Sequence, residues 1–130
     1  MILETSFLID YMKGKEQAIN KMNELIKTNT PITIATPSIF ELFSGLEQSS
    51  KPIVEAEKIK QVLQEQSTWP LNEESARMGG QIHGNLISKS QEIEAIDAMI
   101  AGIATQRRET LLTRNTKHFS RVPGIKLETY

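Results

Sequence analysis

Three acidic residues and one asparagine occupy positions at which a polar side chain could do chemistry: Glu4, Glu41, Asp97 and Asn115. Glu4 ends the first apolar run of the chain, and Asn115 closely follows the apolar segment TLLT at residues 110–113. Glu41 and Asp97 lie in segments whose apolar spacing predicts helices. Carboxylates that converge repel one another unless a cation neutralises them, and Mg²⁺ and Mn²⁺ prefer oxygen ligands of this kind. Together the four residues indicate a divalent-metal site.

Each of these residues also has an ordinary structural explanation. Glu4 can cap the helix that follows it, and Glu41 lies opposite the centre of the apolar arc of its predicted helix, where a solvent-facing glutamate is the default. Asp97 lies near a helix N-terminus, where a carboxylate interacts favourably with the helix dipole. Asn115 is a common turn residue. Metal chemistry therefore requires that the four side chains converge in the folded chain.

Composition restricts the chemistry that remains. The 130 residues are typical of one domain spanning residues 1–130, and a formal net charge of −1 provides no global basic field for coating nucleic acid. The absence of cysteine excludes disulfides, thiolate catalysis and cysteine-bound zinc. No apolar run reaches the roughly 18 residues of a membrane span, and acids interrupt the first apolar segment, which argues against a signal peptide. We therefore expect a cytoplasmic protein.

Strands alternate with helices along the chain. Short apolar runs predict strands at residues 1–5, 31–35, 68–71, 110–113 and 125–129. Helical spacing predicts helices at residues 6–12, 16–27, 52–65, 72–89 and 92–107. One more helix is predicted with Thr36 as its N-cap and Pro37 at its first helical position. Residues 115–120 form a loop or a single helical turn. This order is typical of an α/β fold with a parallel sheet, in which polar chemistry gathers beyond the carboxyl ends of the strands.

The same spacing predicts which apolar side chains are buried. In the helix after Pro37 they are Ile39, Phe40, Leu42, Phe43 and Leu46; in the helix from residue 52, Ile53, Ala56, Ile59 and Leu63; and in the helix from residue 92, Ile96, Met99, Ile100 and Ile103. Asp97 falls at the edge of the last stripe, above Ala101 and Ala104, whose small side chains permit close approach of another element.

The segments around Glu4, Glu41, Asp97 and Asn115 resemble, in their order and spacing, those of the PIN-domain family. The resemblance is specifically to the toxin component of VapBC-type toxin–antitoxin pairs. The segments that carry the resemblance are MILETSFLID, TPSIFELFSGL, IEAIDAMIAGIA and LLTRNTKHFSRVPGIKLE. The resemblance covers essentially the whole chain and implies a three-layer fold with a short, mainly parallel sheet. It assigns Glu4, Glu41, Asp97 and Asn115 to the four site positions of the family, with Glu4 where the family normally has Asp.

The resemblance implies a metal-dependent endoribonuclease that hydrolyses RNA, with tRNA or ribosomal RNA as the usual target. Glu4, Glu41 and Asp97 would then hold one or two Mg²⁺ or Mn²⁺ ions that activate water, and Asn115 would position water or metal. Supporting residues around them would be Thr5, Ser6, Glu94 and Thr113. The family also implies a homodimer and a small antitoxin that obstructs the acidic pocket.

A local basic segment suggests how RNA would be bound. Between residues 107 and 126 the chain has six arginines and lysines and only one acidic residue. Arg114 and Lys117 flank Asn115 and are predicted to hold phosphates near the metal, although ordinary surface charge also explains them.

Glu4 leaves open whether this chain cuts RNA efficiently. Glu is one methylene longer than Asp, and Mg²⁺ tolerates little departure from octahedral geometry, so we expect weakened activity and a preference for Mn²⁺. The alternative is a catalytically impaired PIN domain that acts mainly by binding RNA or its antitoxin. A receiver-like phosphoacceptor domain is disfavoured because it needs Asp after its central strand, whereas the segment PITIA is followed by Thr36.

Overall fold

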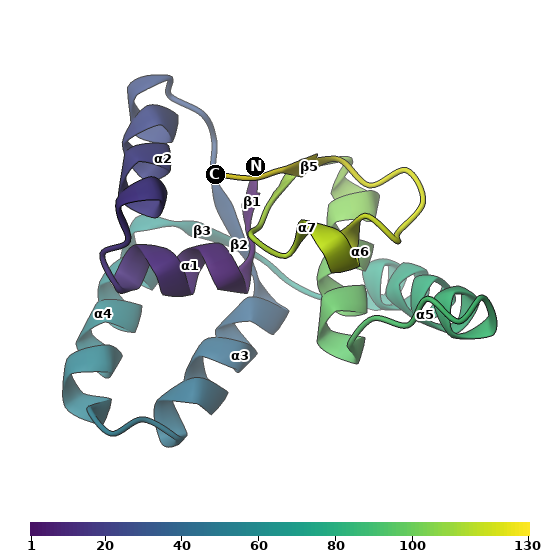
Figure 1. The fold of residues 1–130 in the computed structure, drawn as a ribbon, viewed down its shortest axis with the longest axis horizontal. Helices are drawn as coiled ribbons and strands as arrows, with labels where there is room; N and C mark the ends of the chain where they lie inside the picture. Colours follow the sequence, from purple (N-terminus) through teal and green to yellow (C-terminus); the bar gives the residue numbers. More distant parts are fainter.

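A five-stranded parallel sheet forms the centre of the computed structural model, which describes residues 1–130 (Figure 1). The strands are β1 (Ile2–Leu3), β2 (Thr33–Ala35), β3 (Ser67–Trp69), β4 (Leu111–Leu112) and β5 (Leu127–Glu128). Their order is β3-β2-β1-β4-β5, and all four pairings are parallel. From β1 the chain builds outward through β2 and β3, then returns to place β4 on the other side of β1. The switch point between β1 and β4 is where such a sheet offers a crevice for ligands.

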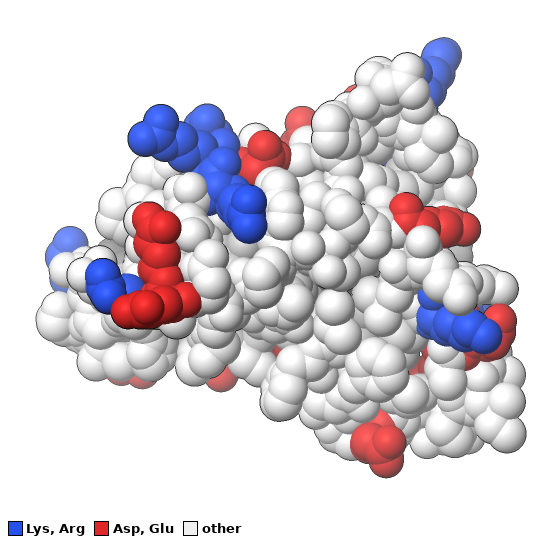
Figure 2. All heavy atoms as spheres, turned by 180° about the vertical axis from the view of Figure 1, so that it is seen from behind, with Lys and Arg blue, Asp and Glu red and all other residues white.

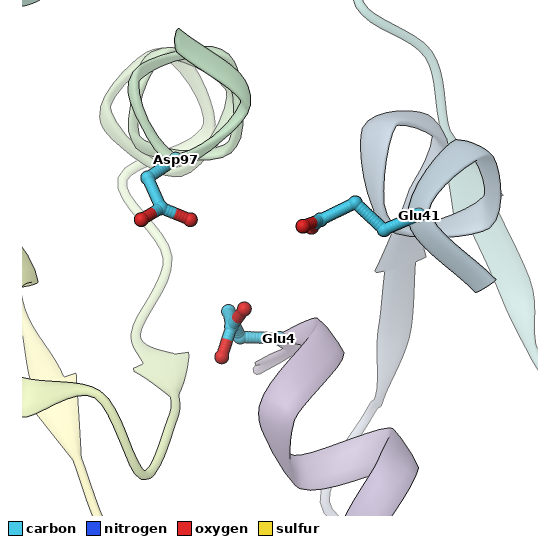
Figure 3. A group of neighbouring side chains, drawn as sticks. All are labelled: Glu4, Glu41 and Asp97. Atoms are coloured by element: carbon cyan, nitrogen blue, oxygen red, sulfur yellow. The ribbon is translucent and has the colours of Figure 1, made fainter. Parts of the chain in front are cut away.

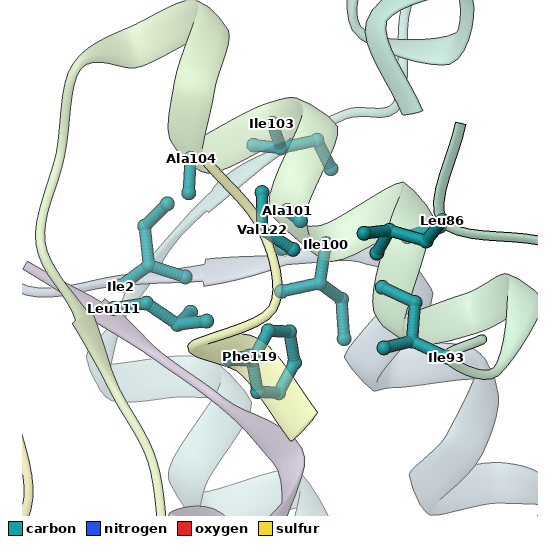
Figure 4. Close-up of a cluster of buried hydrophobic side chains, with 12 residues drawn as sticks. Ile2, Leu86, Ile93, Ile100, Ala101, Ile103, Ala104, Leu111, Phe119 and Val122 are labelled. Carbon is teal, nitrogen blue, oxygen red and sulfur yellow. The ribbon is translucent and has the colours of Figure 1, made fainter. Parts of the chain in front are cut away.

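Helices cover both faces of the sheet (Figure 1). They are α1 (Thr5–Met12), α2 (Glu16–Lys27), α3 (Thr36–Glu47), α4 (Pro52–Glu65), α5 (Glu73–Ser88), α6 (Ala95–Arg107) and α7 (Thr116–Phe119). Strand residues alternate between two cores, as the period of a strand requires. Ile2 and Leu111 pack against α5, α6 and α7 (Figure 4), whereas Leu3 and Leu112 pack against α1 to α4. The predicted three-layer α/β fold is confirmed.

The strands are shorter than predicted, and several large apolar side chains predicted to be buried are exposed. Phe40 is 64% exposed, Ile53 86% and Met99 37%. In α6, Ile100 and Ile103 are buried as predicted and Ile96 is partly buried, but Met99 is exposed because the helix also contacts its neighbours through small residues. These small buried residues are Ala98, Ala101, Gly102 and Ala104. No helix in the chain combines the length and the apolar character needed to cross a bilayer.

The start of α3 also differs from the prediction. Thr36 is the first helical residue and does not cap the helix; the capping position is Ala35. The Thr36 hydroxyl instead accepts a hydrogen bond of 3.1 Å from the backbone N–H of Leu71. This contact ties the segment after β3 to the end of β2.

Glycine at position 102 allows α5 and α6 to pack closely. A Cβ atom added at Gly102 would lie 2.3 Å from the backbone oxygen of Ser75 and 2.8 Å from the backbone nitrogen of Gly79. Neither neighbour is the end of a flexible side chain, so the two helices would have to separate. Since α6 carries Asp97, the position of this carboxylate depends on the packing.

We predict that Gly102→Ala lowers the free energy of unfolding by about 1–3 kcal/mol, the usual cost of overpacking. The matched control is Gly80→Ala in α5, where an added Cβ meets nothing within 4 Å. That change should be neutral or stabilising by up to about 1 kcal/mol, because alanine favours helices more than glycine does. Urea denaturation of both variants measures the difference, and equal stabilities would contradict the packing argument.

Candidate metal centre

Three carboxylates converge beyond the carboxyl ends of the central strands (Figure 3). Glu4 lies between β1 and α1, Glu41 lies in α3, and Asp97 lies in the first turn of α6. One carboxylate oxygen from each residue lies within 4.8 Å of the other two. The three side chains point toward one space from three elements that are far apart in the chain (Figure 3). Glu4 and Asp97 are buried, and Glu41 is half-buried.

Glu4 both caps a helix and faces this space. Its backbone is extended, with φ −76° and ψ 156°, which places it at the N-cap of α1. Its Oε2 atom accepts hydrogen bonds from the backbone N–H of Ser6 (3.0 Å), from the Ser6 hydroxyl, and from the Thr113 hydroxyl (2.7 Å). No hydrogen bond reaches Oε1. The capping explanation and the ligand explanation are therefore compatible, because each uses a different oxygen.

Glu41 is oriented by a short chain of hydroxyl groups. Thr5 Oγ1 lies 2.7 Å from Glu41 Oε1 and 2.9 Å from Ser38 Oγ. A hydroxyl has one proton to donate. The Thr5 hydroxyl is therefore placed to donate either to Glu41 Oε1 or to Ser38 Oγ, and Ser38 is fully buried one turn before Glu41 in α3. This arrangement directs Glu41 toward the cluster, although its helical position suggested a solvent-facing side chain.

Burial and neighbouring negative charges raise the pKa of two of the three acids, Asp97 and Glu41. Burial raises the pKa of Asp97, and the charges of Glu4, Glu41 and Glu94 raise it further, to about 7. Burial also raises the pKa of Glu41, and the charges of Glu4 and Glu94 act in the same direction, although the hydrogen bond from Thr5 opposes them. Raised pKa values of this kind are expected when carboxylates that converge on a cation-binding position have no cation between them.

The donor set fits a hard divalent cation. It consists of carboxylate oxygens, with neighbouring hydroxyl groups and no nitrogen or sulfur ligand, which suits Mg²⁺ or Mn²⁺. Three carboxylates would supply part of the coordination, and Mg²⁺ characteristically keeps several waters. Glu4, Glu41 and Asp97 are therefore the residues that would hold such an ion.

The remaining predicted site residues contact the three carboxylates indirectly. The backbone N–H of Asn115 donates 2.9 Å to Thr113 Oγ1, which in turn donates to Glu4, so Asn115 is connected to the cluster through Thr113. Glu94 occupies the N-cap position of α6 without a side-chain capping hydrogen bond, is exposed, and its charge acts on both Asp97 and Glu41.

The two basic residues assigned to RNA differ in their surroundings. Lys117 is exposed in the last turn of α7 and makes no ion pair. The guanidinium of Arg114 is paired with Asp10, whose Oδ1 atom accepts from Nη1 at 2.6 Å. Arg114 is thus already bound to a carboxylate within the chain.

Sequence reasoning missed Ser38 and Asp10. Ser38 precedes Glu41 by three residues, and this spacing on a helix is a signal that could have linked them. Asp10 lies six residues after Glu4 within an apolar segment, and a carboxylate among apolar residues is itself a reason to look for a partner. Its partners come from residues 15, 114 and 130, which no local pattern connects.

The match of the PIN-domain family model spans residues 1–125. The chain therefore belongs to the PIN-domain family. It is similar to ribonuclease VapC19 of Mycobacterium tuberculosis, with 29% identity over 126 residues and 96% coverage of each chain. It is 27% identical over 129 residues to the tRNA(fMet)-specific endonuclease VapC of Salmonella typhimurium, covering 99% of this chain and 96% of the relative.

A solved structure supports the same relationship. The crystal structure of VapBC2 from Rickettsia felis, bound to a DNA fragment from its promoter, contains a chain that matches with a TM-score of 0.90 and 26% identity. The match covers 99% of this chain and 97% of that chain. The architecture and the whole length of the domain are therefore shared.

The burial of Asp97 and the repulsion within the cluster predict how stability depends on pH in the absence of metal. A carboxyl group whose pKa is raised on folding imposes no penalty below the unfolded value, and its penalty grows as the pH rises through the folded value. For Asp97 this window runs from 3.8 to about 7. Asp97→Asn should therefore raise the free energy of unfolding in EDTA at pH 8, by on the order of 2–4 kcal/mol, and much less at pH 5.

Urea denaturation of wild type and Asp97→Asn at the two pH values provides the measurement. The exposed neighbour Glu94→Gln is the control, and its effect should be smaller because its own carboxylate is solvated. A stability difference between wild type and Asp97→Asn that is the same at pH 5 and pH 8 would show that Asp97 is not held in a repulsive field.

Proposed function

We propose that this chain is a metal-dependent endoribonuclease, the toxin component of a toxin–antitoxin pair, which hydrolyses phosphodiester bonds in RNA. The observation that carries the proposal is the convergence of Glu4, Glu41 and Asp97 at the switch point of a PIN-domain sheet. Relatives that match nearly the full chain are named ribonucleases or endonucleases. The cluster and the family thus support the same class of reaction.

The protein side of the mechanism follows from the contacts. Glu4, Glu41 and Asp97 would hold Mg²⁺ or Mn²⁺, which when bound activates water and stabilises charge on the phosphoryl group. Ser6 and Thr113 hold one oxygen of Glu4 and leave the other free, and Thr5 fixes Glu41.

The region beside Glu4 offers groups for the substrate. The backbone N–H of Asn115 is bound to Thr113 Oγ1, and we assign the side-chain amide of this residue to position water or metal. Exposed Lys117 follows in α7 and is assigned to the RNA backbone. The name of the Salmonella relative makes tRNA the first substrate to try, with ribosomal RNA as the other candidate.

Exposed apolar surface supports the proposed protein partners. Phe40 and Phe43 on α3 and Ile53 and Val54 on α4 are all more than 45% exposed. A groove of about 410 Å³ between α1, α3 and α4 is lined by Ile9, Met12, Leu42, Leu46 and Ile59, with Glu41 at its wall. We assign these surfaces to a cognate antitoxin and to a second copy of the chain, because uncovered apolar area of this kind marks interfaces.

The proposal predicts RNA cleavage that needs a divalent ion. Purified protein should cut total RNA or tRNA in Mn²⁺ or Mg²⁺ and should not do so in EDTA. Asp97→Asn should reduce the rate by at least about 100-fold, because a misplaced or missing charge near the reacting group has costs of that size. Glu57→Gln, an exposed change on α4 that also removes one negative charge, is the control for net charge and should cut normally.

Mapping of new RNA ends by sequencing identifies the product. Full activity of Asp97→Asn, or cleavage that persists in EDTA, would refute the assignment. Binding of RNA or antitoxin with no cleavage by wild type in either metal would favour the second candidate function, a catalytically impaired PIN domain. The observation behind that candidate is Glu4, which stands where the family normally has Asp.

Glu4→Asp tests the effect of side-chain length. Aspartate is a favoured N-cap, so α1 should still begin normally, while its carboxylate lies one methylene closer to the backbone. We predict that Glu4→Asp cleaves RNA faster than wild type, by up to about 100-fold in Mg²⁺ and by less in Mn²⁺. The comparison needs initial rates in both metals. Equal rates for the two proteins in Mg²⁺ would show that the longer side chain is no handicap.

A further inference from the structure

Asp10 binds two cations with one buried oxygen. Its Oδ1 atom accepts from Arg114 Nη1 at 2.6 Å and lies 2.9 Å from Lys15 Nζ. The Asp10 side chain is 3% exposed, whereas those of Lys15 and Arg114 are 50% and 54% exposed. Because both nitrogens bind the same oxygen, they lie within a few ångströms of each other. The carboxylate is hidden beneath two cations that still have donors facing solvent.

The other oxygen of Asp10 is bound from inside the protein. Tyr130 donates its hydroxyl to Oδ2 at 2.7 Å, and its ring packs edge-on against Phe7 with the ring centres 4.9 Å apart. Burial by itself would raise the pKa of Asp10, but the hydrogen bonds from Tyr130 and Lys15 and the charge of Arg114 hold that pKa below its usual value. Asp10 is therefore a fixed anion near neutral pH.

Backbone contacts hold both cations in place as well. The N–H of Lys15 donates 3.0 Å to the carbonyl oxygen of Asp10, across a turn in which Gly14 has φ +75°. The N–H of Arg114 donates 3.1 Å to Ser6 Oγ, and the same hydroxyl donates to Glu4 Oε2. Each cation is thus attached at its backbone and its side chain. Such pre-organisation lowers the entropy lost on binding a ligand.

We propose that Lys15 and Arg114 form a binding site for one phosphate group of the RNA strand, with Asp10 as the positioning residue that gathers them. The inference rests on the proposed function, in which RNA is the substrate and its phosphate group is the ligand. Two cations and one carboxylate leave one net positive charge, and the half-exposed cation side chains are nearer to an incoming phosphate than the buried carboxylate. Phosphate oxygens can accept from the ammonium and the guanidinium together.

The location relates this site to the metal centre. Asp10 follows Glu4 by six residues along α1, which is about 9 Å at 1.5 Å per residue. The hydroxyl of Ser6 contacts both the Arg114 backbone and Glu4. A strand bound at the acidic cluster would reach the two cations within a few nucleotides, so the site would hold the substrate near the cleaved bond.

At the other ion pairs of the chain, no two cations share one carboxylate. Arg77 pairs with the single acid Glu73 on the surface of α5, and Lys21 is shared between the two acids Glu24 and Glu128. On the face shown in Figure 2, basic side chains lie in separate groups, several of them beside acidic ones. The pair at Asp10 is the only ion-pair cluster in which two cations share one carboxylate.

The test is binding of a fluorescently labelled single-stranded RNA to the full chain, measured by anisotropy in EDTA at several salt concentrations. Lys15→Gln and Arg114→Gln should each weaken binding, and the double variant should weaken it about tenfold. Since both residues bind one phosphate, the double variant should reduce the salt slope by about 0.7, the value for one single-strand contact, and not twice that amount. Lys27→Gln removes one exposed charge elsewhere and should leave affinity within about twofold.

Asp10→Asn separates positioning from charge. Removing an anion makes the chain more positive, so simple electrostatics predicts tighter RNA binding. A positioning role predicts the opposite, because the two cations lose the group that holds them together. We expect weaker binding, while Tyr130→Phe, which leaves both cation contacts intact, should bind nearly as wild type. Tighter binding by Asp10→Asn, or wild-type binding by the double variant, would overturn the proposal.

Failure of this proposal can be told apart from failure of the nuclease assignment. Binding in EDTA needs no cleavage, so loss of affinity in the double variant supports the phosphate site even if wild type never cuts RNA. Cleavage by wild type combined with unchanged affinity in the double variant refutes the site and leaves the nuclease intact. If Asp10→Asn does not fold by circular dichroism, the double variant and its salt slope decide the question.

Discussion

Electrostatic repulsion among three carboxylates is the constraint on which the rest of this molecule depends. Glu4, Glu41 and Asp97 are brought within 4.8 Å of one another at a site that is largely shielded from water, and the pKa of Asp97 rises to about 7 as a result. A fold gains no stability from such an arrangement. The arrangement is explained if the three carboxylates bind a cation, because the cation removes their repulsion and is bound more tightly for that reason.

The architecture supplies what this arrangement requires. Parallel β1 and β4 lie side by side, so Glu4 and Thr113 leave the sheet at the same edge. Small residues on α6 and the close approach at Gly102 bring Asp97 in from the opposite layer. Hydroxyl groups then orient the side chains: those of Ser6 and Thr113 donate to Glu4, and that of Thr5 donates to Glu41. Backbone topology therefore places all three acids, and short polar side chains also orient Glu4 and Glu41.

The alternation of apolar runs was enough to predict a parallel α/β sheet, because buried strands and amphipathic helices have different periods. It did not predict the strand order, since nothing local says that β4 returns to lie beside β1. Helix faces were predicted less well. Phe40 and Met99 looked like core residues, yet α3 and α6 pack through smaller side chains and leave these two exposed.

In the candidate site, too, local sequence patterns predicted some features and tertiary structure decided the others. Its residues were named from the ends of strands and from a family resemblance, and their roles remain predictions that the geometry supports. Glu41 is the clearest example, because periodicity alone places it in solvent and only the contact with Thr5 explains its direction. The partners of Asp10 could not be assigned from sequence. Lys15, Arg114 and Tyr130 meet it through tertiary structure, and two of these lie more than 100 residues away along the chain.

A crystal structure of the wild-type chain grown with Mn²⁺ and measured at the manganese absorption edge would show whether the three carboxylates bind one ion. We expect an anomalous peak between them, with Glu4 Oε1, Glu41 and Asp97 as ligands at about 2.0–2.3 Å. An acidic cluster that contains no manganese at millimolar Mn²⁺, with the three side chains turned apart, would contradict it.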